Sequence, residues 1–210
     1  MVTDSDSTDS PSPQKPAGRT RPKPGERRLQ ILQMLATMLQ EPGGERITTA
    51  ALAARLDVSE AALYRHFASK AQMFEGLIQF IEQTLFGLIN QITTQEPDPL
   101  RQLRSILQML LSFAEHNPGM TRVLIGDALV NEHDRLQARI NQLVDRVEAS
   151  VRQCFRGAIE QGQLAASEDP ASRADLLVAY VLGRWMRYAK TGFKRAPAEG
   201  LEVQLRRLVG

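Results

Sequence analysis

The residues best suited to chemistry are polar side chains gathered between Ile47 and Lys70, in the stretch ITTAALAARLDVSEAALYRHFASK. Hydroxyl and ammonium groups of these kinds bind DNA phosphates and set the register of a protein on a duplex. An arginine can reach guanine, and a glutamate can accept a hydrogen bond from a cytosine amino group. The candidates for DNA binding in this stretch are Thr48, Thr49, Ser59, Glu60, Ala61, Tyr64, Arg65, His66 and Lys70.

Apolar residues in the same stretch predict two short helices that would position this chemistry. Leu52, Ala53 and Leu56 lie on one face of the first helix. Leu63 and Phe67, four residues apart, lie on one face of the second. With this face turned inward, the outer face of the second helix presents Ala61, Tyr64 and Arg65, with Glu60 and His66 at its margins.

The residues between the two helices predict a tight turn. Asp57 tolerates a left-handed backbone better than most residues other than glycine, and Ser59 is a favourable N-cap for the next helix. Helix, turn and helix together match a helix-turn-helix motif, whose second helix enters the major groove. The same pattern is also compatible with two packed helices of an all-helical core that has a solvated outer face.

The wider pattern resembles the TetR family of bacterial DNA-binding proteins. The resemblance rests on the order and spacing of Ile47-Thr48-Thr49, Leu52-Ala53, Val58-Ser59, Leu63-Tyr64-Arg65-His66-Phe67, Ser69-Lys70 and Met73-Phe74. Asp57 departs from the pattern, because the family often has glycine there. The resemblance implies a three-helix DNA-binding domain followed by a helical dimerisation and regulatory domain.

Composition narrows the class of protein. The net charge of the 210 residues is only +2, so any attraction to DNA must come from local clustering of charge. One cysteine, Cys154, excludes a disulfide within the chain and fits a reducing cytosol. No apolar run is long enough to span a membrane, and no signal-peptide core follows Met1. We expect a soluble, cytoplasmic protein.

The sequence contains no recognisable catalytic or metal-binding pattern. The histidines His66, His116 and His133 are far apart, and there is no Gly-rich phosphate loop, nucleophile elbow or cysteine pair. Cys154 and Trp185 are expected in the core, and Glu132-His133-Asp134 on a solvated helix surface. We therefore predict a protein that is not an enzyme and has no catalytic residues, metal or cofactor.

Hydrophobic periodicity and Pro/Gly breaks predict an all-α fold with no strand. Residues 1–24 are expected to be a flexible tail, residues 25–69 the DNA-binding domain, and residues 70–210 the helical dimerisation and regulatory domain. The first helix should bury Leu29, Leu32, Leu35, Ala36 and Leu39. Outside the helix-turn-helix, helices are expected at 25–40, 70–93, 100–115, 120–125, 127–160, 171–189 and 197–208.

Basic residues flank the predicted DNA-binding domain. Residues 15–23 form a basic arm that could follow phosphates or enter a minor groove, or could be a solubilising linker. Arg27 and Arg28 are better candidates for DNA contact, because the first helix should hold them near the DNA backbone.

The predicted helix at 171–189 is apolar on more than one face, which indicates burial on two sides. A partner subunit is expected on the second side, and Gly183 would permit close approach. A dimer would read a palindrome with half-sites about 34–36 Å apart. The candidate interface residues are Leu176, Val178, Leu182, Gly183 and Met186.

From about Glu26 to Phe193 the chain is similar to one branch of the TetR family, the nucleoid occlusion factors. The similarity rests on SEAALYRHF, LIQFIE, HNPGMTRVLIGDAL and DRLQARINQL. It implies a nucleoid-associated homodimer, with more than one dimer per site in some cases, that binds palindromic chromosomal sites. When bound to DNA, it would antagonise the division protein FtsZ.

The same resemblance implies a groove for the FtsZ tail along the fourth and fifth helices. The matching positions are Phe80, Met109, Ser112, His116 and Asn117. Phe80 is equally compatible with core packing. Leu88 and His116 stand where arginines would be expected if the groove held an acidic peptide. The alternative function is a TetR-type repressor that a small molecule releases from its operator.

Overall fold

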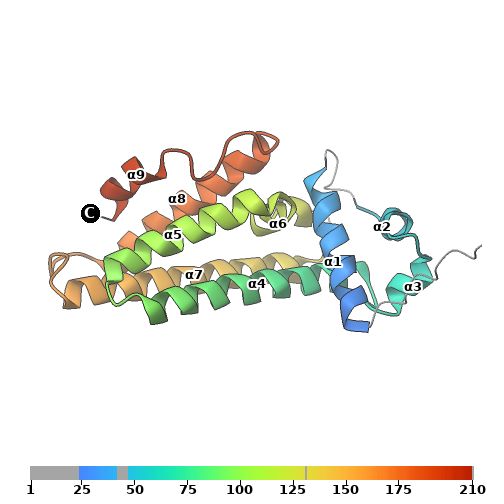
Figure 1. Cartoon of the computed structure of the whole chain (residues 1–210), viewed down its shortest axis with the longest axis horizontal. Helices are drawn as coiled ribbons and strands as arrows, with labels where there is room; N and C mark the ends of the chain where they lie inside the picture. The colour runs from blue at the N-terminus through green and yellow to red at the C-terminus, as the bar shows by residue number, and fades with distance from the viewer. Residues whose placement is uncertain (1–23, 42–46, 131, 210) are drawn as a thin grey trace, which may run out of the picture.

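The computed structural model describes residues 24–41, 47–130 and 132–209, and every regular element in these ranges is a helix (Figure 1). The all-α prediction is therefore confirmed. Most of the predicted tail lies outside these ranges, as do Pro42, Gly43 and Gly44, which were expected to end the first helix. The elements are α1 (Pro24–Gln40), α2 (Thr49–Arg55), α3 (Glu60–Tyr64), α4 (Lys70–Gln95), α5 (Pro99–His116), α6 (Pro118–Leu124), the 3₁₀ helix η2 (Asp127–Leu129), α7 (Asp134–Glu160), α8 (Pro170–Lys190) and α9 (Leu201–Leu208).

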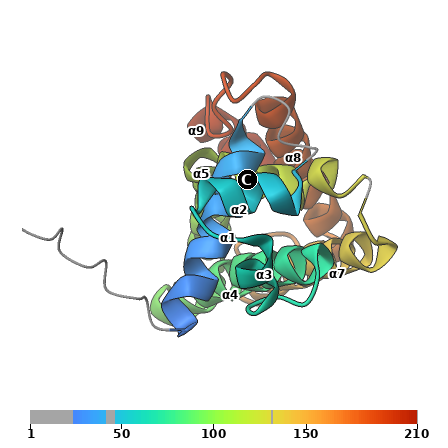
Figure 2. The same cartoon turned by 90° about the vertical axis from the view of Figure 1, so that its right-hand side faces the viewer.

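The long helices α4, α5, α7 and α8 form the body, and α1, α2 and α3 gather at one end of it (Figure 1). Figure 2, which views the molecule from that end, shows these three helices in front of the body. Helix α4 begins beside α3 and runs the length of the body, so one continuous helix belongs to both parts (Figure 1).

Apolar side chains from all four long helices fill the core of the body. Trp185 on α8 is almost completely buried, and its indole N–H donates to the Leu110 carbonyl at 3.1 Å. Cys154 on α7 is also buried, and its Sγ lies 3.3 Å from Gln102 Oε1. Burial raises the pKa of the Cys154 thiol to about 11, so it stays protonated at neutral pH. The core positions predicted for both residues are confirmed.

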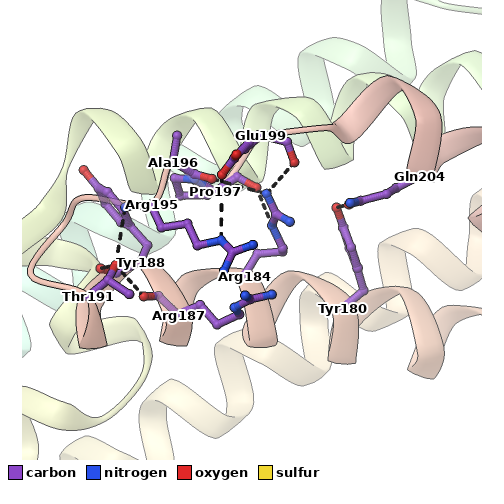
Figure 3. Close-up of polar contacts among 10 residues, drawn as sticks. All are labelled: Tyr180, Arg184, Arg187, Tyr188, Thr191, Arg195, Ala196, Pro197, Glu199 and Gln204. Carbon is purple, nitrogen blue, oxygen red and sulfur yellow. Dashed lines mark hydrogen bonds and ion pairs between the residues drawn. The ribbon is translucent and has the colours of Figure 1, made fainter.

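Side chains of α8 hold the C-terminal segment by hydrogen bonds to its backbone carbonyls and to one of its side chains (Figure 3). The Arg184 guanidinium donates to the carbonyls of Pro197 at 2.7 Å and Glu199 at 2.6 Å. Tyr180 donates to the Gln204 side chain on α9. Helix α9 begins only at Leu201, later than predicted, because Gly200 has a positive φ of 71° that interrupts helical geometry.

Two predictions about helices were wrong. Leu29 is 41 % exposed, because the buried stripe of α1 is centred on Leu35 and Leu29 lies about 120° around the helix from it. The predicted helix at 127–160 is broken after η2, and α7 begins at Asp134. His133 is the N-cap of α7, with its ring Nδ1 accepting from the Arg135 N–H at 3.3 Å.

The end formed by α1, α2 and α3 contacts the body where α1 crosses α6 (Figure 1). Gly119 on α6 lies directly against α1, and a Cβ built there would fall 1.9 Å from the Ala36 carbonyl oxygen. Real atoms do not approach so closely, so any side chain at this position must push the two helices apart.

We expect Gly119→Ala to lower the free energy of unfolding by about 1–3 kcal/mol, as overpacking does in a close helix contact. Urea denaturation followed by circular dichroism measures this change. Gly87→Ala on α4 is the matched control, because no atom lies within 4 Å of its added Cβ. That variant should gain roughly 0.5–1 kcal/mol from lower backbone entropy. Equal stability of the two variants would contradict the close α1–α6 contact.

Candidate nucleic-acid interface

The turn of the helix-turn-helix has the predicted backbone. Asp57 has a φ of +53°, in the left-handed region. The Ser59 hydroxyl accepts from the Ala62 N–H at 3.2 Å and caps α3. At the start of α2, the Thr48 hydroxyl accepts from the Ala51 N–H at 3.1 Å. Thr48 is therefore also an N-cap, a role that its place before an alanine-rich helix could have indicated.

The inner faces of α2 and α3 are buried as predicted. Leu52, Ala53, Leu63 and Phe67 are buried, and Leu56 is half-buried against the same core. Helix α3 itself has only five residues, so Phe67 lies beyond its end. The Phe67 N–H donates to the Leu63 carbonyl at 3.1 Å and so connects the residues after the helix to it. The recognition element is thus one short helix with an ordered turn after it.

The outer polar side chains of α2 and α3 are joined to one another. Thr49 Oγ1 donates to the Glu60 carboxylate at 2.6 Å, and the Tyr64 hydroxyl donates to Thr49 Oγ1 at 3.4 Å. Tyr64, Arg65 and Ala61 are all exposed on the same side of the motif. These contacts hold Glu60 and Tyr64 in place before any ligand arrives.

Arg28 holds the end of the recognition element, a role that the sequence did not reveal. Its guanidinium donates to the His66 carbonyl at 2.8 Å and lies 4.0 Å from the centroid of the Phe67 ring. A planar guanidinium over an aromatic face is an attractive cation–π arrangement. Arg28 thus fastens α1 to the residues after α3, while Arg27 beside it is half-buried and His66 is half-buried.

Lys70, the first residue of α4, follows the N-cap Ser69, whose hydroxyl accepts from the Gln72 N–H at 3.2 Å. The Lys70 ammonium forms an ion pair with Glu132 at 2.5 Å. Glu132 lies before α7 and not on a helix, and its side chain is only 12 % exposed. The expectation that Glu132-His133-Asp134 lie on a solvated helix surface was wrong for Glu132, which is largely buried and precedes α7. His133 and Asp134 are exposed, as the N-cap and the first residue of α7.

Three of the candidate FtsZ-contacting residues lie together at the end of α5. His116 Nδ1 is 2.8 Å from the Ser112 carbonyl, and the Asn117 amide donates to the Phe113 carbonyl at 2.8 Å. His116 and Asn117 line a cavity of about 200 Å³ between this end of α5 and α1. Phe80 and Met109 are half-buried against the core and do not line that cavity.

The candidate dimer residues divide between the surface and the core. Leu176 and Met186 are 60 % and 52 % exposed, and Gly183 is exposed on the same helix. Leu182 is half-buried and lines, with Met186, a groove of about 280 Å³ against α7. Val178 is only 7 % exposed and packs inside the protomer, so its assignment to an outer face was wrong.

Family models match both ends of the chain. Residues 31–77 match the model described as bacterial regulatory proteins of the tetR family. Residues 97–209 match the SlmA-like model described as a tetracyclin repressor-like C-terminal domain. The chain belongs to the TetR family and, within it, to the nucleoid occlusion factors SlmA.

Curated SlmA relatives align over most of the chain. The nucleoid occlusion factor SlmA of Idiomarina loihiensis is 51 % identical over 178 residues, which are 85 % of this chain and 91 % of that protein. SlmA of Alteromonas mediterranea is 50 % identical over 182 residues, 87 % of this chain and 93 % of that protein.

Solved structures with low sequence identity share the fold. A TetR-family regulator from Agrobacterium tumefaciens superposes with a TM-score of 0.76 at 17 % identity, covering 90 % of this chain and all of that one. The fatty acid degradation regulator FadR from Bacillus halodurans gives 0.75 at 15 % identity, covering 90 % and 97 %. At this identity the likeness supports the TetR fold alone.

The described residues of this SlmA family member were also compared with the requirements of a metal site and of a membrane span. In the ranges that the structure covers, no three His, Cys, Asp or Glu side chains gather as metal ligands would. Nor does any helix described there combine the length and apolar character that crossing a bilayer requires.

Proposed function

We propose that this SlmA family member binds palindromic chromosomal DNA as a dimer and, when bound, antagonises FtsZ so that septa do not form over the nucleoid. The observation that carries the proposal is about 50 % identity to SlmA proteins along nearly the whole chain. The proposal also places the protein in the cytoplasm, at the nucleoid, and assigns it a binding role and no catalytic one.

DNA binding is supported by the arrangement at the end of the molecule. The short α3 turns its apolar side inward, and its exposed side carries Ala61, Tyr64 and Arg65. Small and polar side chains at the start of a recognition helix can approach base edges closely. We assign Arg65 and Glu60 to the bases, and Thr49, Tyr64 and Lys70 to phosphates.

If Lys70 and Tyr64 contact phosphates, Lys70→Ala and Tyr64→Ala should weaken binding to every duplex alike. Lys70→Ala should lower the slope of log K against log salt by roughly 0.9, because its ammonium no longer displaces a counterion. Tyr64→Ala removes a neutral hydroxyl, so it should weaken binding and leave the slope unchanged. Fluorescence anisotropy over a salt series measures the slope. Arg156→Ala, at an exposed position near the end of α7, is the control for lost positive charge and should keep the full slope. An unchanged slope in the Lys70 variant would remove it from the phosphate contacts.

Dimerisation through α8 is supported by the exposed Leu176 and Met186 beside the groove against α7. Large apolar side chains on one exposed helix face are typical of a protein–protein interface. One α3 reads few base pairs, so a twofold pair is needed to recognise a palindrome.

Met186→Glu should give monomers, because a charge would be buried in the proposed interface without a partner. Sedimentation measures the mass, and affinity for a palindromic duplex should fall roughly 100-fold as the linked second contact is lost. Val203→Glu on α9, an exposed apolar position outside the proposed interface, should remain dimeric. A dimeric Met186→Glu variant with full affinity would rule out this face.

We place the FtsZ contact at the C-terminal end of α5, with Phe80 and Met109 at its margin. Support comes from position: His116 and Asn117 line the cavity against α1, the helix that also fastens the end of the recognition element through Arg28. DNA docking can therefore act on this surface through α1.

Light scattering of polymerised FtsZ tests the function directly. We expect scattering to fall when this protein is added with a specific palindromic duplex, and to persist with the protein alone or with a scrambled duplex. If the groove holds an acidic segment of FtsZ, His116→Glu should abolish the fall without changing DNA affinity, because like charges repel.

One feature favours the alternative, a ligand-responsive repressor. A cavity of about 570 Å³ lies between α4, α5 and α7, and no charged side chain lines it. Unchanged FtsZ scattering, together with a small molecule that releases the DNA, would support that function over nucleoid occlusion.

A further inference from the structure

Ion pairs connect α4 to α7 and to the segment just before it. Glu75 pairs with Arg135 at 2.8 Å, and Glu82 pairs with Arg139 at 2.7 Å. In both, the acid is on α4 and the base on α7. At the DNA-binding end the order is reversed, since Lys70 on α4 pairs with Glu132 at 2.5 Å.

The reversed pair occupies the ammonium group that the proposed function assigns to a DNA phosphate. The Glu132 side chain is 12 % exposed and that of Lys70 is 32 % exposed, so this pair is less screened by water than a surface pair. A phosphate that approaches Lys70 must compete with the carboxylate for the same N–H donors. If both anions stay, they repel each other at short range.

We propose that Glu132 is a built-in competitor that sets the DNA affinity of this protein by holding Lys70 until a phosphate displaces it. The inference rests on the proposed phosphate contact of Lys70. Glu132 directly precedes His133, the N-cap of α7. Replacement of Glu132 by a phosphate at Lys70 would therefore change a contact at the start of α7, a helix that runs through the body.

Glu132→Gln keeps the shape of the side chain and removes its charge. We expect it to bind a random-sequence duplex about threefold to tenfold more tightly than the unmodified protein, as the loss of one opposing ion pair predicts. A random-sequence duplex is the right probe, because phosphate contacts do not depend on sequence. Fluorescence anisotropy at low salt measures the affinity.

Glu75→Gln is the matched control, because it also removes one acidic charge from the α4 to α7 contacts but leaves Lys70 paired. Its gain in affinity reports the general effect of a less negative protein, and the gain of Glu132→Gln must exceed it. In a Lys70→Met background, Glu132→Gln should raise the affinity for the duplex by no more than the Glu75→Gln control does. The coupling between Glu132 and Lys70 is absent there, because the ammonium has been removed.

Equal gains for the two Gln variants, or weaker binding by Glu132→Gln, would overturn the inference; weaker binding would mean that Glu132 positions Lys70 for DNA. Failure of the proposed function has a different signature. There, the unmodified protein binds no duplex. If the unmodified protein binds but Lys70→Met keeps the full affinity and salt slope, the phosphate contact of Lys70 fails, and the inference fails with it. A third pattern rejects only the role of Glu132 as a competitor and leaves the proposed function intact. In it, the unmodified protein binds tightly, Lys70→Met binds more weakly, and Glu132→Gln shows no gain in affinity.

Discussion

The aromatic ring of Phe67 lies where α1, α3 and α4 meet, and the recognition element depends on it. The five residues of α3 are too few to form a stable helix alone, so tertiary packing must hold them. Arg28 of α1 lies over one face of the ring, and Gly76 of α4 leaves space for it, since a Cβ there would fall 2.9 Å from Phe67 Cε1. The position of the DNA-reading surface thus follows from how one buried side chain packs.

The same end of the molecule is attached to the body by contacts of different kinds. Helix α4 is covalently continuous through both parts, and its first residue pairs with Glu132 before α7. Helix α1 lies against α6 with Gly119 in direct contact with the Ala36 carbonyl. A movement of the recognition surface must therefore be transmitted to α6 and α7 or break these contacts. This geometry gives a physical basis for linking DNA binding to a surface at the end of α5.

Much of the DNA-binding motif could be predicted because its signals are local. Ser59 caps the helix that follows it, Asp57 adopts the left-handed turn, and Leu63 and Phe67 face inward. Each depends on residues a few positions away. The start of α7 was missed because the pattern across residues 127–160 is compatible with one helix. Only the structure shows that η2 ends at Leu129 and that α7 begins at Asp134, with His133 as its N-cap.

Long-range contacts explain the other differences. Val178 and Met186 lie on one helix and are both apolar, yet one is in the protomer core and the other is exposed. Their assignment depends on which side of α8 meets α7. The contacts of Arg28 and Glu132 could not be predicted, because their partners His66 and Lys70 are distant in sequence.

The amino-acid sequence by itself determined the all-helical class and the helix-turn-helix with its turn and the cap at Ser59, because these follow from periodicity and short-range chemistry. The order and spacing of its motifs also carried the resemblance to the TetR family. Tertiary structure alone decided which charges are engaged, which apolar face of α8 stays exposed, and how tightly α1 and α6 approach. Those properties depend on the distance between side chains that are far apart along the chain, and no local pattern encodes that distance.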